Sequence, residues 1–130
     1  MKLSDSTLLR QLCYINGQWA AADSGRSFAV TNPASGEQLA TVPEMGADET
    51  RRAIEAARVA QPAWRAHTAG ERAKVLRRWF ELLLANQEDL AQLMTAEQGK
   101  PLAEARGEIA YVGLFIEWFV DEGKRIYGDI

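Results

Sequence analysis

Apolar residues recur at helical spacing through the second half of the chain. Leu76, Leu83 and Leu90 follow one another at intervals of seven residues, and Phe80 and Met94 fall on the same stripe. This pattern predicts a long amphipathic helix with one face turned towards a core.

Boundary signals frame this stripe on both sides. Thr68 is followed three residues later by Glu71, the pattern of a capping box at the start of a helix. Gly99 favours the left-handed conformation just past a helix end, and Pro101 suits the first turn of the next helix. We therefore predict a helix that begins at Thr68 and ends just before Gly99, with the polar interval 86–89 able to interrupt it.

Two further helices are predicted on either side of this one. The first runs from about Asp48 to Arg65, and the last runs from Pro101 to about Lys124. The last helix is apolar on nearly all sides, which is typical of a helix buried on more than one face. Its apolar residues are Ile109, Val112, Leu114, Phe115, Ile116, Trp118, Phe119 and Val120. We expect it to need partners beyond the other two helices.

The first third of the chain has the shorter pattern of β-hairpins. Asn16-Gly17 between two apolar runs is a strong signal for a tight hairpin turn, and Trp19 is expected to pack inward. Residues 27–31 and 38–42 form a second predicted strand pair around an Asn-Pro turn. Such a small antiparallel unit is too short to be stable alone and must lie on another surface.

Composition agrees with one packed domain. The chain has 130 residues, of which 47% are apolar, enough for one hydrophobic core. We predict an α+β fold with two short β-hairpins in residues 1–45 and three long helices in residues 46–130. The net charge of −3 argues against a nucleic-acid-binding module. One cysteine, no apolar run of membrane-spanning length and no secretory signal favour a cytoplasmic protein.

One carboxylate does not fit a plain helical stripe. Glu97 continues the seven-residue series, and a helix drifts by only about 20° per heptad, so Glu97 is expected close to the apolar stripe. A buried carboxylate needs a partner. The N-terminus of the next helix, Lys100, or a cation held together with backbone carbonyls would each serve. The alternative is that Glu97 frays into water at the end of its helix.

The residues themselves contain no catalytic constellation. Cys13 is expected to be a small buried hydrophobic residue within a strand, and His67 to be a solvated residue between helices. The glycines form no phosphate-binding pattern, and no Cys or His cluster has the spacing of a metal site. The arginine-rich segment 72–78 is interleaved with glutamates, which is typical of a solvated helix face.

Several motifs, taken in order, resemble the N-terminal part of the NAD(P)-dependent aldehyde dehydrogenases. They are YINGQW at 14–19, VTNPASGE at 30–37, TAGERAKVLRRW at 68–79, EQGKPLAEARGEI at 97–109 and FIEWF at 115–119. The resemblance is greatest to the bacterial succinate-semialdehyde dehydrogenase branch and covers essentially the whole chain. Each motif alone is weakly specific, whereas their order and spacing together are strongly specific.

The resemblance implies that residues 1–130 are the N-terminal segment of a longer, homo-oligomeric enzyme with a Rossmann-like α/β fold. In that family the catalytic cysteine and glutamate, and the contacts to NAD or NADP, lie beyond the end of this chain. The isolated chain is therefore expected to bind neither cofactor and to be inactive. Two family roles map onto residues present here: a monovalent-cation site at Val30, Thr31 and Glu97, and one wall of the aldehyde tunnel at Tyr111 and Phe115.

A different class of function is compatible with the same pattern. The chain would then be a stand-alone α+β interaction module, with no nucleic acid or membrane as partner. It would form dimers through the aromatic face of its last helix, at Tyr111, Phe115, Trp118 and Phe119.

Overall fold

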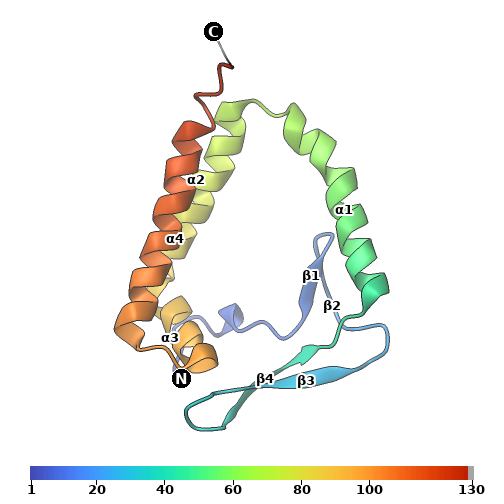
Figure 1. Ribbon diagram of the computed structural model, residues 1–130, viewed down its shortest axis with the longest axis vertical. Helices are drawn as coiled ribbons and strands as arrows, with labels where there is room; N and C mark the ends of the chain where they lie inside the picture. Colours follow the sequence, from blue (N-terminus) through green and yellow to red (C-terminus); the bar gives the residue numbers. More distant parts are fainter. Residues whose placement is uncertain (129–130) are drawn as a thin grey trace.

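The computed structural model describes residues 1–128 and shows two β-hairpins followed by four helices (Figure 1). A short 3₁₀ turn, η1 (Ser6–Leu8), precedes them. The strands are β1 (Cys13–Ile15), β2 (Gln18–Ala20), β3 (Ser27–Thr31) and β4 (Gln38–Pro43). The helices are α1 (Ala47–Ala66), α2 (Ala69–Ala85), α3 (Gln87–Gln98) and α4 (Leu102–Glu122). The predicted α+β class is confirmed.

Both hairpins form where the turn residues predicted them. Asn16 and Gly17 adopt φ values of 51° and 79° between β1 and β2, which suits a turn that needs two positive φ angles. β3 pairs with β4 in antiparallel register, and the two hairpins form separate two-stranded sheets. Trp19 does not pack inward as predicted. It is exposed, with its ring against Tyr14 and beneath the guanidinium of Arg10.

The predicted long second helix is two helices. α2 begins at the predicted capping box, where the Thr68 hydroxyl accepts a hydrogen bond from the Glu71 N–H. It ends at Asn86, whose φ of −109° and ψ of 16° leave the helical range. The Asn86 side-chain amide donates to the Leu82 carbonyl at 2.8 Å and so caps α2 from within the polar interval. α3 then starts afresh at Gln87.

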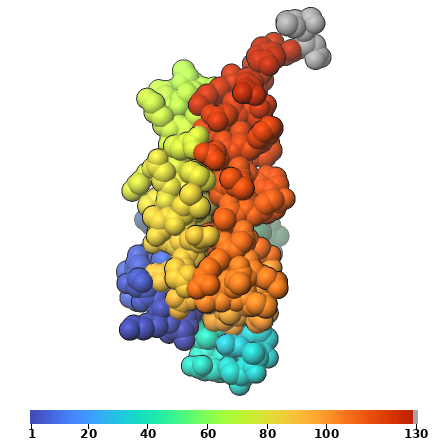
Figure 2. All heavy atoms as spheres, turned by 90° about the vertical axis from the view of Figure 1, so that its left-hand side faces the viewer, coloured from blue at the N-terminus to red at the C-terminus, as the bar shows by residue number. Residues whose placement is uncertain are grey.

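The helices α2, α3 and α4 pack together through small residues. Ala91 of α3 and Ala105 of α4 are fully buried beside Ile109, surrounded by Leu90, Met94 and Leu102. Gly113 of α4 faces Phe80 of α2, and a Cβ at that position would touch the Phe80 ring at 3.4 Å. Figure 2 shows α2 and α4 lying side by side along the molecule.

α1 stands apart from this helix group and lies against the first hairpin (Figure 1). Large apolar side chains are exposed on α1, α2 and α4 within the described residues. On α2 and α4 they are Val75, Trp79, Leu82, Leu84, Tyr111, Val112, Leu114, Phe115, Trp118 and Phe119. The last helix is therefore covered on one side by residues 1–128, and its second apolar face is open. No helix within residues 1–128 has the length and apolar character needed to cross a membrane.

Candidate functional site

The turn between β3 and β4 meets the junction between α3 and α4. Gly99 ends α3 in the left-handed conformation, with φ of 74°, and its N–H donates to the Thr95 carbonyl at 2.9 Å. A Cβ at Gly99 would lie 3.0 Å from the Pro33 side chain. The contact brings the hairpin that carries Val30 and Thr31 to the helix end next to Glu97.

The seven-residue spacing had predicted Glu97 close to the apolar stripe, and this prediction is wrong. Its side chain is exposed and makes no hydrogen bond or ion pair within residues 1–128. The prediction failed at the end of the helix: Leu90, seven residues earlier in α3, packs against the core, whereas Glu97 lies in the last turn, one residue before α3 ends. Lys100, one of the three partners considered for Glu97, pairs with Glu108 of α4 instead.

Val30 and Thr31 lie at an irregularity in the second hairpin. Val30 pairs with Ala40 and Thr31 with Gln38, so that Leu39 is an extra residue in β4 and the ladder is interrupted there. Val30 is half-buried and Thr31 is exposed. The described residues contain no cluster of three or more His, Cys, Asp or Glu side chains around one point. A cation here would depend on backbone carbonyls and one flexible carboxylate.

A shallow hollow lies beside this junction. Its lining comes from the N-terminus, the β3–β4 turn, α3 and the start of α4, at Met1, Asn32, Gln92, Thr95, Ala96 and Leu102. The Thr95 hydroxyl oxygen is buried and has no hydrogen-bond partner within residues 1–128. Asn32 is already engaged, because its side-chain oxygen accepts from the Ala34 N–H at 2.9 Å.

The predicted tunnel residues lie together on the open face of α4. The rings of Tyr111 and Phe115 meet edge to face, with centroids 4.9 Å apart. Both side chains are exposed, one helical turn apart, on the side of α4 away from Ile109. An aldehyde tunnel needs an opposite wall, and residues 1–128 place none in front of this pair.

Two buried carboxylates were not singled out by the sequence. Glu49 in the first turn of α1 is 5% exposed and accepts the N–H groups of Asp23 at 2.9 Å and Gly46 at 3.0 Å. Asp89 in the first turn of α3 is 4% exposed and accepts the N–H groups of Ser4 and Asp5. An acidic residue in a first helical turn was the available signal, but the sequence does not show which distant N–H groups it would meet.

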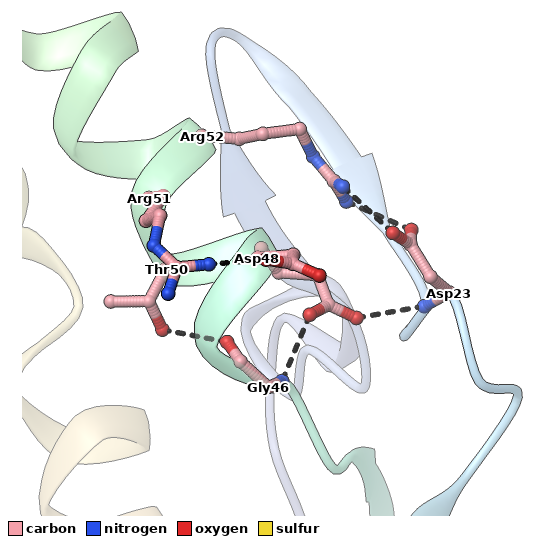
Figure 3. A network of polar contacts seen from close by, with 7 residues as sticks. Asp23, Gly46, Asp48, Thr50, Arg51 and Arg52 are labelled. Atoms are coloured by element: carbon pink, nitrogen blue, oxygen red, sulfur yellow. Dashed lines mark hydrogen bonds and ion pairs between the residues drawn. The ribbon is translucent and has the colours of Figure 1, made fainter.

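Contacts around Glu49 favour its charged form. The Asp23 N–H, followed by other backbone N–H groups, holds the pKa of the Glu49 carboxyl below its ordinary value, against the opposing effect of burial. Arg52 makes two hydrogen bonds to the Asp23 carboxylate, at 2.7 and 2.8 Å, and lowers the pKa of Asp23 (Figure 3). The loop after β2 is thereby fastened to the start of α1 through charge-assisted bonds.

The glycines of positive φ within residues 1–128 lie in turns and at helix ends. Gly17, Gly25 and Gly36 are in the hairpin region, Gly99 ends α3, and Gly128 follows α4. None of these five lies between a strand and the helix after it, where a phosphate-binding loop would be. Cys13 lies half-buried in β1, paired with Ala20, with no histidine adjacent in the hairpin.

The family match and the most similar relatives named here all belong to the aldehyde dehydrogenases. Residues 19–130 match the aldehyde dehydrogenase family. The chain is 67% identical over 129 residues to a glutarate-semialdehyde dehydrogenase of Pseudomonas putida and 64% identical over 129 residues to a succinate-semialdehyde dehydrogenase [NADP(+)] of Escherichia coli. Each alignment covers 99% of this chain and 27% of the relative. The chain thus spans about a quarter of the length of these relatives.

Solved structures show the same partial coverage. A crystal structure of an E. coli NADP-dependent enzyme superposes with a TM-score of 0.96 at 64% identity, over 98% of this chain and 27% of that one. A succinate-semialdehyde dehydrogenase from Burkholderia pseudomallei gives a TM-score of 0.96 at 60% identity, over 99% and 27%. The hairpins and helices described above therefore have the same arrangement in these two longer chains.

Proposed function

Because the chain belongs to the aldehyde dehydrogenase family, we propose that it is the N-terminal part of an NAD(P)-dependent enzyme that oxidises a small semialdehyde to its acid. The observation that carries this proposal is the identity of 64–67% over 129 residues to two semialdehyde dehydrogenases. Succinate semialdehyde and glutarate semialdehyde are the two substrates to test. Each has an aldehyde at one end and a carboxylate at the other.

The open apolar face of α4 supports the view that these residues are one part of a larger enzyme. Leu114, Trp118 and Phe119 are each exposed within residues 1–128. Contiguous apolar surface of this kind normally marks an interface. We propose that the rest of the enzyme covers it, in a cytoplasmic homo-oligomer, and that the isolated chain is inactive.

A graft tests this proposal. Residues 1–130 replace the matching segment of the E. coli succinate-semialdehyde dehydrogenase, to which they are 64% identical. We expect the purified graft to reduce NADP⁺ with succinate or glutarate semialdehyde faster than with butanal, which lacks the carboxylate. The isolated chain should produce no NAD(P)H above a no-protein control.

Two outcomes count against the proposal. A graft that is inactive although it has the size and circular dichroism of the parent enzyme would contradict the assignment to this reaction. Aldehyde-dependent NAD(P)H production by residues 1–130 alone would contradict the inactivity of the isolated chain.

We also propose a monovalent-cation site formed by Glu97 with the carbonyls of Val30 and Thr31. The contact between Gly99 and Pro33 supports it, because it joins the two segments concerned. In the graft, potassium should raise the melting temperature, and Glu97→Gln should remove that increase. Glu37→Gln, at an exposed residue of the same hairpin, is the matched control. Melting that does not respond to potassium in the unmodified graft would contradict the site.

The exposed aromatic residues of α4 also keep the interaction module open as a second candidate. It predicts a monodisperse, cooperatively melting dimer of residues 1–130 in light scattering. Phe115→Ser and Trp118→Ser should then convert the dimer to monomer. Association without a defined size favours the enzyme segment instead.

A further inference from the structure

The first residues of the chain contact α3, which lies more than 80 residues later in the sequence. The Asp89 carboxylate accepts the Ser4 N–H at 2.9 Å and the Asp5 N–H at 2.8 Å, one on each oxygen. The Lys2 N–H donates to the Gln92 side chain at 3.3 Å, one turn further along α3. Asp89 is almost completely buried, and a buried carboxylate is stable only when such donors replace water.

From α3 the chain crosses towards the hairpins. The Gln11 side-chain oxygen accepts the Thr41 N–H of β4 at 3.0 Å. The β1–β2 hairpin then lies against α1. Residues 1–23, which we name the N-terminal strap, thus run from the α2–α3–α4 group to α1, between parts that stand apart in Figure 1.

The second end of the strap repeats the arrangement of the first. The Glu49 carboxylate accepts the Asp23 N–H on one oxygen and the Gly46 N–H on the other. Figure 3 shows Asp23 held at the same time by the guanidinium of Arg52. Each end of the strap is therefore fastened by a buried carboxylate in the first turn of a helix. Asp89 accepts two N–H groups of the strap, whereas Glu49 accepts one, from Asp23, and a second from Gly46 at the start of its own helix.

We propose that the N-terminal strap is a conformational device that sets the position of α1 relative to α2, α3 and α4, with Asp89 and Glu49 as its two fasteners. α1 is joined to α2 by the link His67–Thr68, and at this corner the Arg72 side chain of α2 donates hydrogen bonds to the carbonyls of Arg65 and His67. The start of α1, about twenty residues away, has its main packing contact with β1. The corner holds one end of α1, and the strap holds the other. The strap connects the α2–α3–α4 group to the start of α1 and thereby fixes the angle between α1 and α2.

Hydrogen exchange on the 130-residue chain tests the fasteners separately. Glu49→Gln and Asp89→Asn keep the shape of each side chain but replace one acceptor oxygen by an NH₂ group that faces an N–H donor. Loss of a hydrogen bond to a charged acceptor should accelerate exchange about tenfold at the amides concerned. These are Asp23 and Gly46 for Glu49→Gln, and Ser4 and Asp5 for Asp89→Asn. Glu37→Gln is the control and should leave all four unchanged.

The position of α1 is measured by spin labels at residues 59 and 104 in a Cys13→Ser background. Both sites are exposed, one on α1 and one on α4. We expect a narrow distance distribution in the parent and in Glu37→Gln, and a clearly broader one when Glu49→Gln and Asp89→Asn are combined. Glu49→Gln alone and Asp89→Asn alone each remove fewer hydrogen bonds than the combined variant. We expect each to broaden the same distance distribution by a smaller amount.

Equal distance distributions in all variants, with the helical circular dichroism retained, would overturn the proposal. So would unchanged exchange at the four amides. Neither measurement depends on enzymatic activity, so the strap can fail while the proposed dehydrogenase function stands, and the reverse also holds.

Discussion

The two sides of this molecule differ in their apolar packing. On one side, α2, α3 and α4 share a small buried apolar contact at Ala91, Ala105 and Ile109, with ion pairs of Arg77 with Glu117 and of Arg106 with Glu88 around it. On the other side, α1 and the hairpin region are joined mainly by hydrogen bonds and ion pairs, and the apolar residues Ile54 and Val59 of α1 are exposed. The described residues thus have a small core on one side and a polar fastening on the other.

This difference shows what each side requires from its surroundings. A side held by apolar packing is insensitive to pH and sensitive to changes in side-chain volume. A side held by charge-assisted hydrogen bonds is sensitive to pH and less sensitive to changes in side-chain volume. The same substitution made on each of the two sides should therefore change the free energy of unfolding by different amounts.

The largest difference is expected between two isoleucines. Ile109 of α4 is 8% exposed within the small core, whereas Ile54 of α1 is 64% exposed. Ile109→Ala should lower the free energy of unfolding by about 2–5 kcal/mol, because it leaves a cavity beside Ala91 and Ala105. Ile54→Ala should change it by less than about 0.5 kcal/mol. Urea unfolding followed by circular dichroism measures both, and equal losses would remove the distinction between the two sides.

Local signals in the sequence predicted most of the fold. Asn16-Gly17, the Thr68 capping box and Gly99 act through their nearest neighbours, and each appears where it was predicted. The family resemblance is likewise confirmed by the match over residues 19–130.

What the sequence could not supply depended on contacts between distant residues. The polar interval marked a possible interruption, and α2 does end there. The spacing did not show that Glu97, in the last turn of α3, is exposed while Leu90 of the same helix packs against the core. Trp19 was expected to pack inward, yet it is 45% exposed, and its ring meets Tyr14 and Arg10 instead of the core. Asp89 and Glu49 accept N–H groups from Ser4, Asp5 and Asp23, which are 26 to 85 residues away, and no local pattern links those positions. The Gly46 N–H bond to Glu49 is a local capping contact.

A smaller effect is expected at the contact between the two sides. Gly99→Ala places a side chain at φ of 74° and 3.0 Å from Pro33. The left-handed conformation costs an alanine about 1–2 kcal/mol, and the contact should push the β3–β4 turn away from the α3–α4 junction. Thermal unfolding should show a loss of stability of at least this size.

Gly107→Ala is the matched control for that change. Gly107 is an exposed residue inside α4, and a Cβ there would meet no atom within 4 Å. Because alanine favours the helix, this substitution should stabilise the chain by about 0.5–1 kcal/mol. Two glycines would thus respond with opposite signs, and a loss at Gly107 equal to that at Gly99 would contradict the role of the Pro33 contact.

The smallest effect is expected from acid, and on the side that contains α1 it should centre on Glu49. The Asp23 N–H and the other backbone donors lower the pKa of Glu49 from its ordinary value of 4.5. A carboxyl whose pKa is lower in the folded state adds stability above the unfolded pKa and loses it as the pH falls through the folded pKa. Glu49 should therefore stabilise the chain fully above about pH 4.5 and progressively less below it. The difference in melting temperature between the parent and Glu49→Gln should shrink over that interval, whereas the difference between the parent and Ile109→Ala should not. A Glu49→Gln difference that is constant from pH 7 to about pH 3 would show that the carboxylate charge does not fasten α1.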